Sequence, residues 1–175
     1  MIYEPREDSH LLQKTIKPYA KGTVLDMGTG SGIQAVEARK YTFKVLGVDI
    51  DPEVIKECKK KFPTIEFRTS NLFSNVREKF NLITFNPPYL PEDPMLKDIA
   101  LDGGPLGYEV IEAFLIEAKE HLNNNGTILL LFSSLSHKNK IHEILKREKY
   151  SYKEIANEKM AFEELYVYEV KWKNF

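Results

Sequence analysis

The residues Val24–Gly32, VLDMGTGSG, are the most informative part of this 175-residue chain for its fold class. The run at 23–27, TVLDM, predicts a buried strand, and Gly28, Gly30 and Gly32 follow it directly. Glycines at this point permit a tight turn and let a ligand approach the backbone closely. A helix predicted to run to about residue 40 would offer free N–H groups at its start. The stretch therefore predicts a strand, a ligand-binding loop and a helix in succession.

Strand and helix patterns alternate along most of the remaining chain. Further strands are predicted at 43–50, 64–69, 81–85 and 127–132, and helices at 108–122, at 138–149 and from Asp51-Pro52 onward. This alternation predicts an α/β fold: a mostly parallel sheet with helices on both faces. The tail at 150–175 alternates polar and apolar residues as a closing antiparallel hairpin would. We expect one domain over residues 1–175, with 1–20 as an N-terminal segment.

Composition limits the classes of protein to consider. Hydrophobic residues make up 42% of the chain, and no apolar run approaches the ~20 residues of a membrane helix. The N-terminus, MIYEPREDSH, lacks an apolar secretory region, which favours a cytoplasmic protein. Cys58 is the only cysteine, and the histidines show no metal-ligand spacing, so we expect no disulfide and no metal. The net charge of −1 lacks the basic footprint typical of nucleic-acid binding.

The spacing within the glycine loop limits the class of ligand that the loop could bind. The pattern is G-x-G-x-G, and Ile33 stands where the dinucleotide fingerprint requires Gly or Ala. Asp26 lies at the end of the strand, where its charge would repel a pyrophosphate and attract an ammonium or sulfonium group. The loop therefore favours a nucleoside with a cationic tail, such as S-adenosylmethionine, over NAD.

Two other strand ends carry candidate cofactor residues. Asp49 ends the second strand, where a carboxylate can accept hydrogen bonds from ribose hydroxyls. Asp51, two residues later, is better suited to cap the following helix. Asn71 follows the third strand; its amide could meet the edge of adenine while Leu72 packs on the ring, or it could be a simple turn residue.

The motif Asn86-Pro87-Pro88-Tyr89 follows the fourth strand, NLITF (81–85), at the edge where ligands bind in open parallel sheets. Prolines lack N–H groups, and a residue before proline is held extended, so the loop is stiff and rich in acceptors. The Asn86 side-chain oxygen and the Pro87 carbonyl could receive the two hydrogens of a planar –NH2 group, while Tyr89 stacks on it. Such acceptors would stabilise the positive charge that develops on nitrogen during attack on a methyl group.

These motifs resemble a known enzyme family. VLDMGTGSG, GVDID (47–51) and NPPY (86–89) are similar to those of Rossmann-fold S-adenosylmethionine-dependent methyltransferases that act on amide or exocyclic nitrogens. YEPREDSHLL (3–12) and LDGGPLGYEVI (101–111) resemble the release factor glutamine methyltransferases of the HemK-like family, in their short archaeal and eukaryotic branch. Bacterial relatives carry a separate N-terminal helical domain, for which we expect no room here.

The resemblance implies a seven-stranded sheet with the last strand antiparallel, and it assigns roles. Ser9 would approach the cofactor from an N-terminal segment that covers it. The amino-acid end of the cofactor would be held by Asp26, Gly28 and Gly30. Asp49 would bind the ribose, and Asn71 and Leu72 would contact adenine. The target glutamine would bind at Asn86, Pro87, Pro88 and Tyr89. Asn71 departs from the pattern, since the family more often has Asp there, so weaker or rearranged adenine binding is expected.

The resemblance also implies partners: the Gly-Gly-Gln loop of a translation release factor as substrate, and a small zinc-binding activator. The third strand, at 64–69, is expected at an edge of the sheet, where an activator could dock by strand addition. The alternative is an RNA or DNA methyltransferase, because NPPY also serves adenine and guanine amines. A non-catalytic protein that keeps the fold would have no need of the amine cradle.

Overall fold

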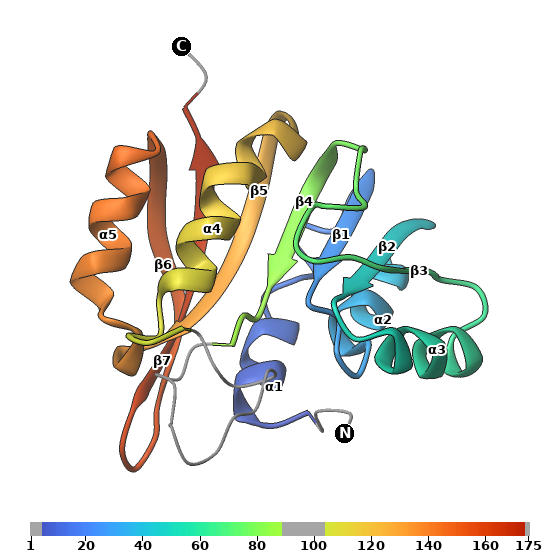
Figure 1. Ribbon diagram of the computed structural model, residues 1–175, viewed down its shortest axis with the longest axis horizontal. Coiled ribbons are helices and arrows are strands. Elements are labelled where there is room, and N and C mark those ends of the chain that lie inside the picture. The colour runs from blue at the N-terminus through green and yellow to red at the C-terminus, as the bar shows by residue number, and fades with distance from the viewer. Residues whose placement is uncertain (1–4, 89–103, 174–175) are drawn as a thin grey trace.

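The computed structural model describes residues 5–88 and 104–173. Within these residues, the strands form one seven-stranded sheet of order β3-β2-β1-β4-β5-β7-β6 (Figure 1). Strands β1 to β5 are parallel, whereas β7 runs antiparallel to both β5 and β6. The expected sheet, with its last strand antiparallel and its third strand at an edge, is confirmed. The strands are β1 (Thr23–Met27), β2 (Lys44–Asp49), β3 (Glu66–Thr69), β4 (Phe80–Phe85), β5 (Leu122–Ser133), β6 (Tyr150–Lys159) and β7 (Glu164–Trp172).

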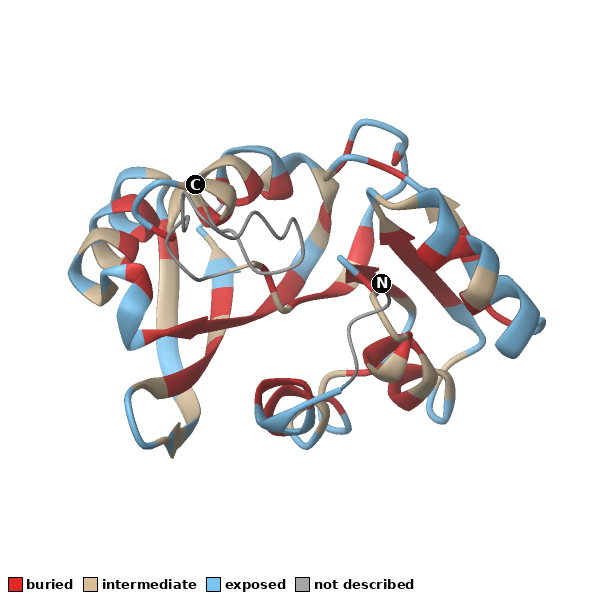
Figure 2. Ribbon diagram, turned by 60° about the horizontal axis from the view of Figure 1, so that its bottom comes forward, coloured by how far each residue is buried: buried red, intermediate tan, exposed pale blue. Residues whose placement is uncertain are grey.

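Helices cover both faces of the sheet (Figure 2). One face packs against α1 (Glu7–Gln13), α2 (Ile33–Arg39) and α3 (Pro52–Lys61), and the other against α4 (Glu109–Ala118) and α5 (Lys138–Arg147). Successive strand residues alternate between the two cores: Val24 belongs to the first, and Leu25 to the second. Burial on both faces explains why these strands read as continuous apolar runs in the sequence. None of the described helices has the length and apolar character needed to cross a membrane.

Two elements differ from the sequence predictions. Helix α1 was not predicted, and it is held by packing: Leu12 and the nearby Ile16 are fully buried. The strand predicted at 127–132 begins earlier, at Leu122, so the NNNG segment at 123–126 forms the start of β5, where the pairing with β4 shifts register. A Cβ atom at Gly126 would lie 2.9 Å from the carbonyl oxygens of Asn123 and Phe80, so this irregular pairing requires glycine. The chain reaches β5 from α4 through a 3-10 turn, Lys119–His121.

The strand order places a topological switch point between β1 and β4. From β1 the chain winds outward to β2 and β3, then crosses back to β4 on the other side. Met27, the last residue of β1, pairs with Val48 of β2 and with Phe85 of β4. The residues that follow these three strands therefore share one carboxyl edge. Ligands bind at such a crevice in open α/β sheets.

Candidate functional site

The glycine loop turns sharply between β1 and α2. Gly28, Gly30 and Gly32 have φ values of 63°, 50° and 82°, in the left-handed region that favours glycine. Gly28 is exposed, and a Cβ atom there would meet only ordinary contacts in this structure. The Thr29 N–H donates to the Val48 carbonyl oxygen at 2.8 Å, which ties the loop to the end of β2. The loop thus leaves an open backbone surface at the switch point.

Asp26 lies beneath this loop with only 1% of its surface exposed. Its Oδ2 accepts from Thr29 Oγ1 at 2.7 Å and from the Ala35 N–H at 3.1 Å, and its Oδ1 accepts from Thr84 Oγ1 at 3.0 Å. Burial raises the pKa of Asp26 to about 6, although these hydrogen bonds oppose the rise. Asp26 therefore fastens the loop and α2 to β1 and β4, and its direct contact with a cofactor stays a prediction.

Asp49 ends β2 beside the loop. Its Oδ2 accepts from the Gly30 N–H at 3.0 Å, and its Oδ1 accepts from the Asp51 N–H at 3.1 Å. Burial raises the pKa of Asp49, and the nearby Asp51 charge adds to the rise. As predicted, Asp51 caps α3 by accepting from the Glu53 N–H. The next residue to Asp49, Ile50, keeps 51% of its surface exposed at the same edge, an apolar wall that the sequence reasoning missed.

Asn71 and Leu72 follow β3 on the outer side of this edge. Asn71 is exposed, and its backbone N–H is held by Ser74 Oγ at 3.1 Å. Leu72 has a φ of 45°, which is rare for an apolar residue, and packs partly against the core. The Asn71 segment is thus a turn whose side chain remains available, so both readings of this residue stand.

Asn86 follows β4 directly, and one of the two polar atoms of its side-chain amide lacks a hydrogen-bond partner among the described residues. Its Nδ2 donates to Asp8 Oδ2 at 3.1 Å, from helix α1. Its Oδ1 is buried and has no hydrogen-bond partner within residues 5–88 and 104–173. Pro87 is buried and Pro88 is partly buried, whereas Tyr89 lies outside the described residues. A buried acceptor without a donor is costly, so this atom indicates where a ligand's N–H group would bind.

Helix α1 brings the N-terminal segment to the site. Ser9 is 3% exposed, and its carbonyl oxygen accepts from Gln34 Nε2 of α2 at 2.8 Å. Asp8, one residue earlier, is 4% exposed and contacts Asn86. The sequence reasoning named Ser9 and missed Asp8, although both belong to the EDS triplet.

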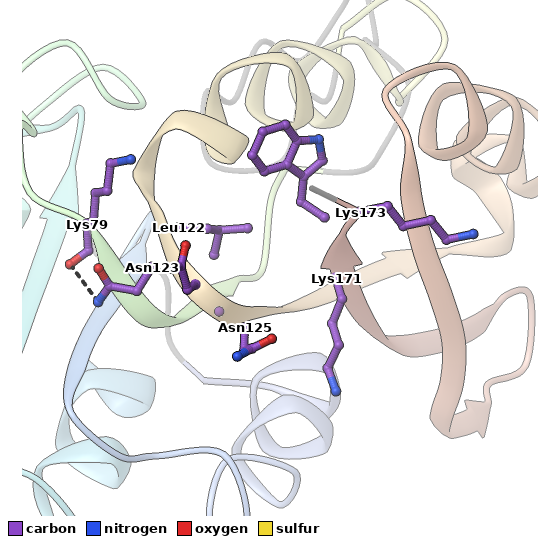
Figure 3. A pocket seen from close by; sticks show the side chains of 9 residues that line it. Lys79, Leu122, Asn123, Asn125, Lys171 and Lys173 are labelled. Atoms are coloured by element: carbon purple, nitrogen blue, oxygen red, sulfur yellow. Dashed lines mark hydrogen bonds between the residues drawn. The ribbon is translucent and has the colours of Figure 1, made fainter. Parts of the chain in front are cut away.

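A separate polar pocket of about 740 Å³ lies at the other end of the strands, where the parallel strands β4 and β5 begin (Figure 3). It adjoins the start of β5 and the end of β7, and none of the predicted site residues line it. Its lysine side chains point in different directions in Figure 3, so they do not converge on one ligand position. Its lining residues are Lys79, Leu122, Asn123, Asn124, Asn125, Gly126, Lys171, Trp172 and Lys173.

The residues at the carboxyl edge fit a nucleoside with a cationic tail. Two carboxylates, Asp26 and Asp49, lie at the loop. Burial raises the pKa of both, and a neighbouring acid adds to each rise: Asp49 at Asp26, and Asp51 at Asp49. Gly28 and the apolar side chain of Ile50 are exposed at the same edge. Among the described residues, no group of three or more His, Cys, Asp or Glu side chains could hold a metal ion.

Comparisons with known proteins agree with this chemistry. Residues 6–163 match the family model of the methyltransferase small domain. A protein of Methanocaldococcus jannaschii, provisionally assigned as a protein N5-glutamine methyltransferase, is 38% identical over 95% of this chain and 89% of its own length. A release factor glutamine methyltransferase of Deinococcus radiodurans is 31% identical over 69% of this chain and 49% of its own length. This chain thus spans about half of the Deinococcus protein.

A solved structure has the same fold. One chain of the E. cuniculi Mtq2–Trm112 complex, which is responsible for methylation of the eRF1 translation termination factor, superposes with a TM-score of 0.80. The match has 23% identity and covers 98% of both chains. More distant sequence relatives include the ribosomal RNA small subunit methyltransferase C of Haemophilus influenzae, 27% identical over 72% of this chain and 37% of that protein.

Proposed function

This chain belongs to the methyltransferase small-domain family, and from that membership we propose that it methylates a glutamine side-chain amide in a translation release factor. The target is the glutamine of the Gly-Gly-Gln loop. The observation that carries the proposal is the buried Asn86 Oδ1, an acceptor without a donor among the described residues, at the switch point of the sheet.

Asn86 and Pro87 would hold the target nitrogen. A glutamine –NH2 group has two donors, and we assign them to Asn86 Oδ1 and the Pro87 carbonyl oxygen. The lone pair of an amide nitrogen is delocalised, and these acceptors draw the N–H groups out of the amide plane. They also stabilise the positive charge that grows on nitrogen in the transition state. The proton leaves to water afterwards, so no general base is assigned. Pro88 stiffens the loop, and Tyr89 is proposed to stack on the glutamine.

The cofactor side of the site is assigned to the glycine-loop edge. S-adenosylmethionine, the cofactor of these enzymes, supplies a methyl group on a positively charged sulfur. We assign its amino-acid end to Gly28 and Gly30, with the buried charge of Asp26 beneath them. Asp49 would bind the ribose hydroxyls. The remaining roles follow the resemblance: Ser9 covers the cofactor, and Asn71 and Leu72 contact adenine, with Ile50 as an added wall.

The carboxylates at this edge support a cationic ligand. Asp26 is almost fully buried, and a positive charge nearby would offset the unfavourable burial of its ionised form. A site lined by basic residues would instead repel a positively charged ligand. A near-attack alignment of the methyl group with the target nitrogen accounts for the rest of the rate enhancement.

A small zinc-binding activator is proposed to dock on strand β3. Among the described residues β3 pairs with no strand other than β2, so its outer edge has no strand partner; the Thr69 carbonyl oxygen accepts a hydrogen bond from Asn75 Nδ2 at 3.1 Å. The other edge strand, β6, is less suited to strand addition. Its pairing with β7 carries a register shift between Glu154 and Ala156. The assembly would act in the cytoplasm, where release factors work.

RNA methylation is the second candidate, because ribosomal RNA methyltransferases are among the more distant relatives. Their 27% identity is lower than that of the two glutamine methyltransferase relatives, at 38% and 31%. The near-neutral charge of this chain also supports a protein substrate over a polyanion.

The deciding experiment uses tritiated S-adenosylmethionine. The purified chain, with and without the activator, is given a release factor, a variant of that factor with Gln→Asn in its Gly-Gly-Gln loop, or total RNA. We expect label on the unmodified release factor alone, lost on protease treatment. Label that only nuclease removes would refute the glutamine assignment and favour the RNA reaction.

Docking on β3 is tested separately by hydrogen exchange. We expect the activator to slow exchange of the amides of Glu66–Thr69 while those of Tyr150–Lys159 stay unchanged. Protection confined to β6 would place the activator on the other edge strand of the sheet.

A further inference from the structure

We propose that Asp8 is a positioning residue that fixes which way the Asn86 amide faces, so that Oδ1 and not Nδ2 points at the target amide. The inference deepens the proposed function and rests on it for its catalytic consequence. It adds a third group, from the N-terminal helix, to an arrangement otherwise built at the end of β4.

The contact joins two elements 78 residues apart in the chain. Asp8 Oδ2 accepts from Asn86 Nδ2 at 3.1 Å, and Asp8 Oδ1 accepts from the Ser9 N–H at 2.6 Å. Asp8 is only 4% exposed, so water competes little for either oxygen. The carboxylate therefore links a backbone donor of α1 with the side-chain donor of Asn86 (Figure 1 shows α1 beneath the end of β4).

The chemistry of the two side chains makes the contact selective. An amide side chain can rotate by a half turn, which exchanges its oxygen and nitrogen. A carboxylate only accepts hydrogen bonds, so the rotated Asn86 would set oxygen against oxygen at Asp8. The same rotation would aim Nδ2 at the –NH2 group of the substrate, donor against donor. Asp8 thus excludes the orientation of Asn86 that cannot bind an amide nitrogen.

Helix α1 holds Asp8 in place from several sides. Leu12 is fully buried in the core that α1 shares with α2 and α3. Gln34 Nε2 donates to the Ser9 carbonyl oxygen at 2.8 Å, and Gln13 Nε2 donates to Glu37 Oε2 at 3.2 Å. These contacts fix the helix on α2, so the position of Asp8 does not depend on substrate. The N-terminal segment therefore acts on the substrate side of the site, beyond its expected part in covering the cofactor.

The test compares Asp8→Ala and Asp8→Asn with Glu7→Gln, a matched control on the exposed side of the same turn. Side-chain amide resonances of Asn86, identified by their loss in Asn86→Ala, report its hydrogen bond without any substrate. We expect both Asp8 variants to shift these resonances, and Glu7→Gln to leave them unchanged. Asp8→Asn keeps one side-chain oxygen that can still accept a hydrogen bond, so its shift should be the smaller.

Kinetics on the release factor give the second readout. We expect Asp8→Ala to lower kcat by about 100-fold, the scale of a misplaced catalytic group, and Asp8→Asn to lower it less. The Kd for S-adenosylmethionine and the Tm of Asp8→Asn should stay close to wild type. A wild-type kcat in both Asp8 variants, or unchanged Asn86 resonances, would overturn the proposal.

The two proposals fail in different ways. If the wild-type chain does not methylate the release factor, the proposed function is wrong, and the Asn86 resonances alone decide the role of Asp8. A shift in the Asp8 variants but not in Glu7→Gln then supports the fixed orientation. Equal resonances in all variants would refute it whatever the substrate is.

Discussion

Asp26 and Asn86 lie at the carboxyl ends of two neighbouring strands, β1 and β4, yet their side chains differ in how many of their polar atoms have hydrogen-bond partners. The Asp26 carboxylate accepts three hydrogen bonds from Thr29, Ala35 and Thr84 and is 1% exposed. Asn86 makes one hydrogen bond, to Asp8, and its buried Oδ1 has no partner among the described residues. Both sites lie at the switch point, and both looked like ligand residues in the sequence.

This difference distinguishes a residue that stabilises the fold, Asp26, from a residue that is proposed to bind the substrate, Asn86. A fully paired group holds the elements around it, and here Asp26 joins the loop, α2 and β4. A buried group that is left partly unpaired lowers the stability of the folded protein, and such groups are found where a ligand completes them. We therefore expect changes at Asp26 to act first on stability and changes at Asn86 to act first on methyl transfer.

The largest expected effect comes from Asn86→Ala. It removes the acceptor for the target –NH2 group, and we expect kcat to fall by about 100- to 1000-fold, the cost of deleting one transition-state hydrogen bond. The Kd for S-adenosylmethionine, measured by calorimetry, should remain near the wild-type value because the residues assigned to the cofactor lie in α1 and at the ends of β1, β2 and β3.

Asn81→Ala is the matched control at the other end of β4. The Asn81 Oδ1 accepts from the Thr23 N–H at 3.0 Å, a contact far from the carboxyl edge. This variant should lose stability and keep kcat. If Asn86→Ala weakens cofactor binding as much as it slows methyl transfer, the separation between the two strand ends is wrong.

The next effect is the dependence of stability on pH at Asp26. The folded pKa, about 6, lies above the ordinary value of 3.8. Between these values the unfolded chain has lost the proton while the folded chain keeps it, so stability falls as pH rises through this window. Relative to Asp26→Asn, wild type should lose about 3 kcal/mol of unfolding free energy between pH 3.5 and 7.

Urea denaturation of both proteins across this pH range measures the difference. Other groups titrate in both proteins and cancel in the comparison. Asp51→Asn, which keeps a good helix cap at the same edge, shows whether losing any carboxyl here gives the same profile. A difference between wild type and Asp26→Asn that stays flat with pH would show that Asp26 is not held protonated by burial.

The sheet could be predicted from the sequence because its strands are continuous apolar runs, and its order follows from the winding rules of α/β folds. Helix α1 could not be predicted so well. Its seven residues, EDSHLLQ, are too few to form a stable helix alone, and packing of Leu12 supplies what local propensity lacks. The start of β5 was predicted too late because the residues NNNG before 127 are typical of turns, and the close backbone contacts at Gly126 come from pairing that the local sequence does not indicate.

The site was predictable as a set of strand ends but not as a set of contacts. The glycine loop, Asp49 and Asn86 share one edge because parallel strands end together. The pairing of Asp8 with Asn86 joins residues 78 positions apart, and nothing in either local pattern indicates it. The same limit applies to Asp26: its hydrogen bond from Thr84 of β4 could not be predicted from the local sequence, and its contact with a cofactor stays a prediction.

The smallest effect is expected at Asn71, on the exposed outer side of the edge. Asn71→Asp introduces a carboxylate, which accepts a hydrogen bond from an amine more strongly than an amide does. We expect affinity for the cofactor to rise about threefold, or roughly 0.6 kcal/mol, as for one exposed polar contact.

S-adenosylhomocysteine lacks the positive sulfur, so an equal gain in affinity for S-adenosylmethionine and S-adenosylhomocysteine means contact with adenine. A gain for S-adenosylmethionine alone means charge attraction. Asn124→Asp, the same change at the opposite edge, should alter neither affinity; equal gains from both variants would assign the effect to net charge and leave Asn71 a turn residue.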